Sequence, residues 1–233
     1  MRRTHTVLHQ ALRAASRNTA DSFEHHTTSA KFLAASQSIS SIPELHGLPE
    51  VVVAGRANAG KSTLLNAVIG RTTTPLMHSS KKAGRTRALN FFSIGPSAHG
   101  RLVLVDAPGY GRVSKQEWGQ LFEHYLEYRT QLRRVYVLIN TPHGIGKSDA
   151  LFLEMLDALT QTGSLPWTYQ AIFTQIDRLT PAQIGETAKL KEELHRLAPT
   201  CLPPLFTASM KPRLGIETVR SSILEACGLT TLD

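Results

Sequence analysis

The stretch Gly55–Ser62, GRANAGKS, limits the possible folds of this chain most strongly, because it follows a valine-rich run and precedes a helical pattern. In that context, the spacing G-x-x-x-x-G-K-S predicts a loop that wraps a phosphate group. Gly55 and Gly60 let the backbone approach the phosphate, and successive amides would donate to it at a helix N-terminus. Lys61 would reach the β- and γ-phosphates, and Ser62 would ligate Mg²⁺. The motif predicts a nucleotide but does not say which one.

The rest of the chain alternates short apolar runs with helical patterns from residue 49 onward. We expect strands at 50–55, 89–95, 101–108, 134–140, 168–175 and 204–209, and helices at 61–69, 118–132, 148–160, 181–197 and 216–226. This order predicts a three-layer α/β fold, a mostly parallel six-stranded sheet with helices on both faces. Only PSAHG separates the second and third strands, so the second strand should run antiparallel in a hairpin.

Two further motifs come at turns where such a sheet binds ligands, beyond the carboxyl ends of its strands. Asp106 ends the third strand and could hold Mg²⁺ through water, and the amide of Gly109, after Pro108, could meet a γ-phosphate. In the basic loop before the second strand, the Thr86 hydroxyl could complete the magnesium shell while a γ-phosphate is present. A plain Pro-Gly turn and a surface loop without a role are the alternatives.

The turns after the fifth and sixth strands, TQID and TAS, adjoin the place where a base would lie. Helix capping is the commoner role for an aspartate such as Asp177. At this place, however, its carboxylate can accept hydrogen bonds from guanine N1–H and N2–H, a pair that adenine lacks. Backbone amides near Ala208 and Ser209 could meet the guanine carbonyl oxygen. Asp177 therefore favours a guanine nucleotide over the ATP of a P-loop kinase.

The charge of the chain is concentrated in one segment. Residues 51–105 contain no acidic residue and eight of the 26 Lys and Arg residues, and the other 18 match the 18 Asp and Glu residues. Such clustering favours a polyanionic partner, although a solvated basic face is the alternative. No apolar run approaches the roughly 20 residues of a membrane helix, so we expect no membrane contact.

The N-terminal residues have a different composition from the rest. The first 20 residues hold four arginines and no acidic residue, as in an organellar transit peptide. We expect residues 1–30 to be a transit peptide or a disordered basic tail. Residues 31–48 would form an extension that packs on a domain of residues 49–229.

With these motifs assembled, the chain resembles the EngB (YihA/YsxC) family of TRAFAC-class ribosome-assembly GTPases over about residues 29–228. The resemblance rests on LPEVVVAGRANAGKSTLLNAV, GRTRALNFF, DAPGYGRVSK, HGIGKSDA and FTQIDRL. It implies an EngB-type G domain over residues 49–229, GTP as the substrate and Mg²⁺ as the cofactor. It also implies a large ribosomal subunit precursor, rRNA and ribosomal proteins, as the partner of a monomer.

The resemblance implies roles for individual residues in five segments. The nucleotide-binding residues would be Gly55, Arg56, Ala57, Asn58, Ala59, Gly60, Lys61, Ser62, Thr63, Gly84, Arg85, Thr86, Arg87, Ala88, Asp106, Ala107, Pro108, Gly109, Thr174, Gln175, Ile176, Asp177, Thr207, Ala208 and Ser209. Lys61, Thr86 and Gly109 would act in catalysis. Ser62 and Thr86 would bind Mg²⁺ directly, and Asp106 through water. Asn58 is a candidate ligand for a stimulatory K⁺.

Three positions depart from related GTPases. The family usually has lysine where this chain has Gln175, so we expect weaker guanine nucleotide binding with the same base preference. INTPHG replaces a stretch in which the family commonly has an aspartate and an arginine before HG. Tyr110 stands where signalling GTPases place the glutamine that orients water. We therefore expect slow hydrolysis, helped by potassium, another residue or the ribosomal particle.

The resemblance implies a GTPase switch in large ribosomal subunit assembly. The arginine-rich N-terminus favours the mitochondrial matrix, with a bacterial-type cytoplasm as the alternative. The rival class is a signalling or trafficking GTPase with protein partners and no rRNA contact. Such a protein would normally carry a glutamine at position 110 and a lipidated tail, whereas this chain ends in GLTTLD, without a cysteine for prenylation.

Overall fold

The computed structural model describes residues 30–77, 88–97, 100–110, 116–208 and 214–230, and the side chains of residues 116–118 lie outside this description. The strands are β1 (Lys31–Ser36), β2 (Glu50–Gly55), β3 (Leu89–Ile94), β4 (Leu102–Asp106), β5 (Leu132–Asn140), β6 (Thr168–Thr174) and β7 (Leu202–Phe206). The helices are α3 (Lys61–Val68), α4 (Gln116–Tyr128), α5 (Lys147–Gln161), α6 (Pro181–Gly185), α7 (Thr187–Leu197) and α8 (Ile216–Ala226). Short 3₁₀ turns are η2 (Ile39–Ser41), η3 (Thr141–His143) and η4 (Ile176–Arg178).

The strands form one sheet in the order β1-β3-β4-β2-β5-β6-β7. The five strands from β4 to β7 are parallel, whereas β3 pairs antiparallel with β4 and β1 pairs antiparallel with β3. The α/β class, the mostly parallel sheet and the antiparallel second strand are therefore confirmed. The predicted number of six strands is wrong, because the described chain has seven in this sheet.

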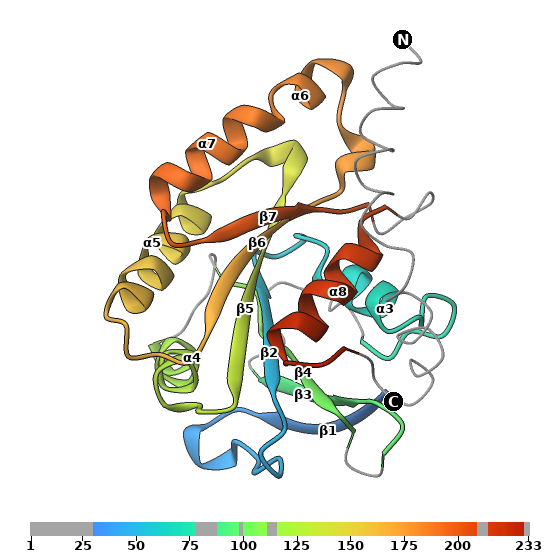
Figure 1. Cartoon of the computed structure of the whole chain (residues 1–233), viewed down its shortest axis with the longest axis vertical. Coiled ribbons are helices and arrows are strands. Elements are labelled where there is room, and N and C mark those ends of the chain that lie inside the picture. The colour runs from blue at the N-terminus through green and yellow to red at the C-terminus, as the bar shows by residue number, and fades with distance from the viewer. Residues whose placement is uncertain (1–29, 78–87, 98–99, 111–115, 209–213, 231–233) are drawn as a thin grey trace.

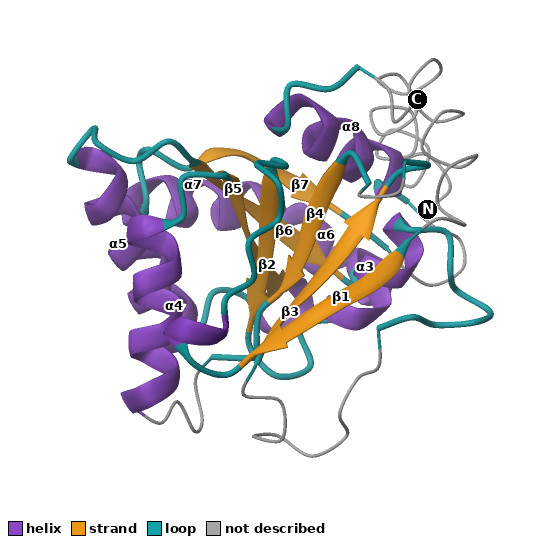
Figure 2. Cartoon of the chain, turned by 90° about the horizontal axis from the view of Figure 1, so that it is seen from below, coloured by secondary structure: helices purple, strands orange, loops and turns teal. Residues whose placement is uncertain are grey.

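The additional strand is β1, which lies at the sheet edge (Figure 2). Its side chains are mostly exposed, and Phe32 meets Phe92 of β3 edge-on at a ring-centroid distance of 5.6 Å. A strand exposed on both faces is stabilised mainly by its backbone ladder, so it lacks the alternating apolar pattern that marks a strand in a sequence. This is why KFLAAS was expected only as part of an extension.

Two apolar cores cover the two faces of the sheet, and β2 contributes to both. Val52 and Ala54 pack with α4, α5 and α7, whereas Val51 and Val53 pack with α3 and α8. Figures 1 and 2 show these two groups of helices on opposite sides of the sheet. Because β2 is buried on both faces, its near-continuous valine run fits the centre of a parallel sheet.

Two of the observed helices differ from the prediction by more than two residues or by a break. The helix expected over 118–132 ends at Tyr128, because Leu132 is fully buried and begins β5 opposite Glu50. The helix expected over 181–197 is divided into α6 and α7 at Gly185 and Glu186. Glycine is a poor helix former, and the core contacts on this face begin only in α7, at Leu190 and Leu194.

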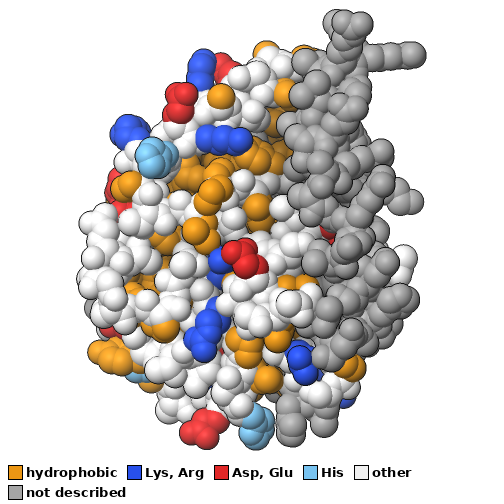
Figure 3. Space-filling view, viewed as in Figure 1, with side chains coloured by type: hydrophobic (Ala, Val, Ile, Leu, Met, Phe, Trp, Pro, Cys, Tyr) orange, Lys and Arg blue, Asp and Glu red, His pale blue; other side chains and the backbone are white. Residues whose placement is uncertain are grey.

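The other edge strand, β7, has the sequence LPPLF. Pro203 and Pro204 remove two backbone donors, which disfavours pairing of this edge with another chain. Figure 3 shows apolar side chains gathered over β7 and the adjoining α7, with Lys and Arg side chains at their border. No helix in the described ranges combines the length and apolarity needed to cross a bilayer.

Candidate functional site

The phosphate loop connects β2 to α3 at the carboxyl edge of the sheet. Gly55 ends β2 so close to β5 that a Cβ there would lie 3.0 Å from the Leu138 carbonyl oxygen. Gly60 has φ 90° and directly precedes α3, a left-handed conformation that favours glycine. Asn58 also has positive φ, 65°. The loop thus turns sharply and leaves the first amides of α3 at its mouth, as anion binding requires.

Lys61 and Asp106 are the charged pair of this loop. The Lys61 Nζ donates to the Gly55 carbonyl oxygen at 3.4 Å. Burial lowers the pKa of Lys61, and the charge of Asp106 opposes this shift. Burial raises the pKa of Asp106 to about 6, and Lys61 opposes that shift in turn. A phosphate beside Lys61 and a metal ion beside Asp106 would therefore stabilise the charged form of each.

The pKa of Asp106 predicts how stability depends on pH. Because the folded value of about 6 exceeds the ordinary 3.8, folding favours the protonated carboxyl group. This contribution is present below about pH 4 and is lost as pH rises through about 6, at a cost of at most about 3 kcal/mol. Melting of the nucleotide-free protein should therefore show this loss, and Asp106→Asn should remove it. Parallel pH profiles of the two proteins would contradict the assignment.

The turn after β4 lies directly on the phosphate loop. A Cβ on Gly109 would come within 3.2 Å of the Ala57 nitrogen, so only a glycine fits without displacing the loop. Ala107 donates its amide to the Val53 carbonyl oxygen at 3.0 Å, and Tyr110 pairs with Arg56 as in a parallel ladder. The prediction that this turn adjoins the phosphate loop is therefore confirmed.

The turns after β6 and β7 meet at the same edge. The Ile176 amide donates to the Thr207 carbonyl oxygen at 3.2 Å, and the Thr207 amide donates to the Phe173 carbonyl oxygen at 2.8 Å. The Asp177 side chain is exposed and has no hydrogen-bond or ion-pair partner among the described residues. It is therefore accessible to a base, and it caps no helix in the described part of the chain.

Thr174 holds the phosphate loop. Its buried hydroxyl donates to the Ala59 carbonyl oxygen at 2.7 Å and lies 3.2 Å from the Ile139 carbonyl oxygen. This bond links the base side of the site to the phosphate side. Contact between Thr174 and the base stays a prediction.

Two amide side chains also converge on the phosphate loop. The Asn58 carbonyl oxygen accepts from Gln175 Nε2 at 3.2 Å and from Asn140 Nδ2 at 3.3 Å. Gln175 has a positive φ of 59°, and its side chain reaches the loop through this bond. Gln175 is thus a neutral donor at the position where the family usually has a lysine, and the other donor, Asn140, belongs to the INTPHG stretch.

Replacing Gln175 by lysine is expected to tighten GDP binding about fivefold, because a charged donor to Asn58 replaces a neutral one. Calorimetry with GDP would measure the change. Gln175→Met is the matched control, since it keeps the length but removes the donor, and it should weaken binding. Unchanged GDP affinity in the lysine variant would contradict the explanation.

Three buried side-chain oxygens at this edge have no hydrogen-bond partner within the described residues. They are Asp106 Oδ1, Asn140 Oδ1 and Thr207 Oγ1. Buried polar atoms are normally satisfied, so three such atoms along one edge of the sheet indicate that polar ligand groups or ions bind there. A hard cation such as Mg²⁺ fits the carboxylate of Asp106 together with the Ser62 hydroxyl at the start of α3.

The structure brings most of the predicted residues together at one edge of the sheet. These are Gly55–Thr63, Ala88, Asp106–Gly109, Thr174–Asp177, Thr207 and Ala208. Ala88 belongs to the group because it precedes β3, whose Asn90 pairs with Asp106. Gly84, Arg85, Thr86, Arg87 and Ser209 lie outside the described residues, so the predictions for them stay predictions.

Two residues of this edge were missed in the sequence. Asn140 lies in a stretch that was noted only for its departure from the family. Asp149 is fully buried. It accepts a hydrogen bond from Tyr110 and forms an ion pair with Arg56. In the sequence it looks like an ordinary first-turn acidic residue of a helix, and only its proximity to two distant loops distinguishes it.

Comparisons with known proteins agree with this geometry. A family model described as "50S ribosome-binding GTPase" matches residues 50–166. "Probable GTP-binding protein EngB" of Brucella melitensis is 36% identical over 203 residues, which cover 79% of this chain and 80% of that protein. The protein of the same description from Rhodopseudomonas palustris is 36% identical over 200 residues, covering 84% and 88%.

Solved structures give the same fold at lower identity. Aquifex aeolicus Era bound to GDP and aluminium fluoride matches with a TM-score of 0.58 and 21% identity, covering 77% of this chain and 57% of that chain. A crystal structure described as a probable GTP-binding protein EngB matches with a TM-score of 0.52 and 15% identity, covering 77% and 98%. At these identities, the likeness shows the fold alone.

Proposed function

Because this chain belongs to the EngB family of GTP-binding proteins, we propose that it binds GTP with Mg²⁺, hydrolyses GTP slowly and acts as a switch in assembly of the large ribosomal subunit. The observation that carries the nucleotide part is the convergence of the phosphate loop, the Asp106–Gly109 turn and the exposed Asp177 at one sheet edge. The unsatisfied oxygens of Asp106, Asn140 and Thr207 at that edge support a bound polar ligand.

Different residues of the site would bind the phosphates and the base. Lys61 and the amides of the phosphate loop would bind the phosphates, and Gly109 would sense the γ-phosphate. Ser62 and Asp106, with the predicted Thr86, would hold Mg²⁺, which when bound neutralises charge on the phosphate oxygens. Asp177 would select guanine. Asn58 remains our candidate for a K⁺ ligand.

The ribosomal part of the proposal rests on the family and on charge. The matched family model is described as a ribosome-binding GTPase, and the acid-free segment 51–105 supplies basic side chains suited to rRNA phosphates. Loops at Thr86 and Tyr110 would dock in the GTP form and release after hydrolysis. A signalling GTPase with protein partners would need no such basic segment.

Co-sedimentation with purified large-subunit precursors tests the switch. We expect the full chain to sediment with the particles in the presence of a non-hydrolysable GTP analogue and to stay in the supernatant with GDP. Binding should fall steeply with added salt, because phosphate contacts release counterions. Equal sedimentation with both nucleotides would refute the switch, and salt-independent binding would refute the rRNA contact.

We also propose a mitochondrial location, on the composition of residues 1–30 alone. A fusion of these residues to a fluorescent protein should enter mitochondria of a eukaryotic cell and should lose its first residues there. A diffuse cytoplasmic fusion of full length would favour the bacterial-type alternative.

A further inference from the structure

A buried carboxylate joins three segments beside the phosphate loop. Asp149, with a side chain 0% exposed, lies in the first turn of α5. Its Oδ1 accepts from the Tyr110 hydroxyl at 3.0 Å, and its Oδ2 accepts from Arg56 Nε and from the Gly146 amide, both at 2.9 Å. The phosphate loop, the turn after β4 and helix α5 are therefore bonded to one side chain.

Tyr110 is held firmly in this cluster. Its side chain is buried, and its ring packs on that of Phe152 of α5 at a centroid distance of 4.5 Å. Burial, reinforced by the charge of Asp149, raises the pKa of the Tyr110 phenol well above its usual range, so the hydroxyl remains a donor. Because this hydroxyl donates its proton to Asp149, the proton is not available to an attacking water.

We propose that Asp149 is a positioning residue for the GTP-bound form, an inference that rests on the proposed function. By holding Tyr110, it keeps the preceding Gly109 against Ala57 of the phosphate loop, where the Gly109 amide would meet the γ-phosphate. GDP lacks the γ-phosphate and needs no such contact. The bond between Tyr110 and Asp149 thus stabilises the GTP form selectively and links the γ-phosphate to the first turn of α5.

The loop before α5 also contacts this cluster. A Cβ on Gly146 would lie 2.6 Å from a terminal nitrogen of Arg56, so the loop before α5 passes directly over the guanidinium group. The amide of the same glycine bonds Asp149. A displacement of the Gly109 turn would therefore disturb Tyr110, Asp149 and the start of α5 together.

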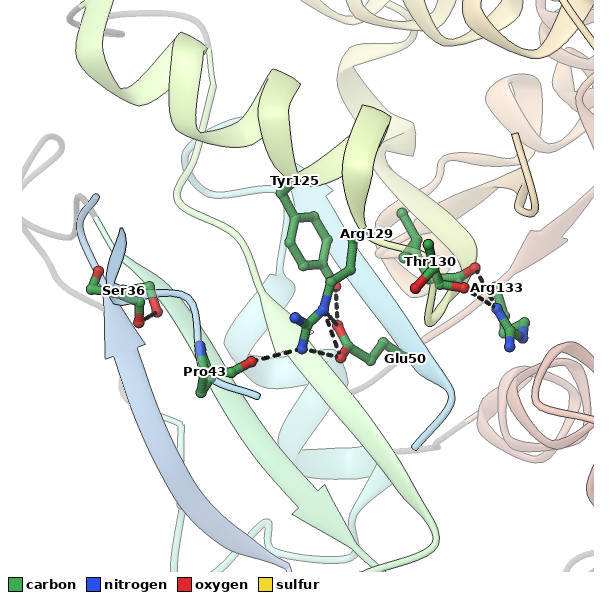
Figure 4. A network of polar contacts seen from close by, with 9 residues as sticks. Ser36, Pro43, Glu50, Tyr125, Arg129, Thr130 and Arg133 are labelled. Atoms are coloured by element: carbon green, nitrogen blue, oxygen red, sulfur yellow. Dashed lines mark hydrogen bonds and ion pairs between the residues drawn. The ribbon is translucent and has the colours of Figure 1, made fainter. Parts of the chain in front are cut away.

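The molecule contains a matched control at the opposite end of β2. Glu50, also fully buried, accepts from the Tyr125 hydroxyl at 2.7 Å and forms an ion pair with Arg129 at 2.6 Å (Figure 4). Arg129 donates further to the Pro43 carbonyl oxygen at 2.9 Å. This cluster has the same three groups, a tyrosine, a carboxylate and an arginine. It lies at the first residue of β2, whereas the phosphate loop follows the last residue of that strand.

The test compares Tyr110→Phe with Tyr125→Phe in the full chain. Each variant loses one hydrogen bond to a buried carboxylate, so both should melt at a lower temperature. Calorimetry should show that Tyr110→Phe weakens binding of a non-hydrolysable GTP analogue about tenfold and changes GDP affinity less than about twofold. Tyr125→Phe should leave the ratio of the two affinities unchanged. Equal ratios in both variants would overturn the inference.

A second variant and a second readout keep the outcome clear. Asp149→Asn keeps an acceptor for Tyr110 but leaves Arg56 without a counter-charge, and we expect the same selective loss of analogue binding. Hydrogen exchange should show that the analogue protects the first turn of α5 in the unmodified chain and not in Tyr110→Phe. Failure of the unmodified chain to bind the analogue would instead refute the proposed function, so the two failures are distinguishable.

Discussion

Replacing Asp177 by asparagine is expected to abolish the preference for GTP and to create a preference for xanthosine triphosphate. The carboxylate of Asp177 is exposed at the sheet edge and has no bonding partner within the described ranges, so it can accept from guanine N1–H and N2–H. Loss of two charge-assisted hydrogen bonds of about 1.5–3 kcal/mol each should weaken GTP binding by on the order of 10³-fold. The asparagine amide can instead donate to the C2 carbonyl oxygen that xanthine has in place of the guanine amino group.

Calorimetry with GTP, xanthosine triphosphate and ATP on the purified proteins measures this exchange. Glu44→Gln is the matched control, because it neutralises another exposed carboxylate, one that precedes β2 and lies far in the chain from the base turns. It should leave all three affinities unchanged. Displacement of GTP by ATP at comparable concentration in the unmodified chain would refute the guanine site itself.

Replacing Gly215 by alanine is expected to destabilise the fold more than a methyl group added at any other described glycine. Gly215 precedes α8 with φ 72°, and a Cβ there would lie 2.1 Å from the Phe206 carbonyl oxygen at the end of β7. Backbone atoms cannot yield cheaply, so β7 and the following Thr207 must shift. We expect a loss of about 4 kcal/mol or more, a large part of a typical folding free energy.

Gly163→Ala separates the steric effect from the backbone effect. Gly163 has a similar φ of 69°, but a Cβ there would meet nothing within 4 Å. The control should therefore lose only the left-handed backbone preference, about 1–2 kcal/mol. Urea unfolding gives both values, and similar losses in the two variants would contradict the close approach at Gly215. Because Thr207 adjoins the predicted base site, Gly215→Ala should also weaken GTP binding at temperatures where it stays folded.

The phosphate loop and several strands and helices could be predicted from local sequence patterns. GRANAGKS carries its geometry in its own spacing, because glycines, a lysine and a following helix within eight residues leave few alternative conformations. The strand 50–55 and the helix 216–226 were placed at their observed bounds, since the valine run is buried throughout and the helix has a buried face that repeats at the helical period. β1 was missed because its side chains are mostly exposed.

The bond of Thr174 to the phosphate loop could not be predicted from local sequence patterns. Its hydroxyl meets the carbonyl oxygen of Ala59, more than a hundred residues away in the chain. The resemblance selected Thr174 as a base-side residue, but only the sheet, by placing the end of β6 beside the loop, shows that it braces the phosphate side. Gln175 and Asn140 reach the same loop in the same way.

The phosphate loop, the turn at Asp106 and the candidate base reader Asp177 could be recognised from the amino-acid sequence, because each lies within a few neighbouring residues, and the alternation of strands and helices along the chain predicted the α/β class. The shared cluster of Arg56, Tyr110 and Asp149, and the two neutral amides that brace Asn58, could be seen only in the folded chain. The physical reason is that burial and hydrogen bonding depend on which strand ends lie side by side. That order is set by packing of the whole sheet and not by distance along the chain.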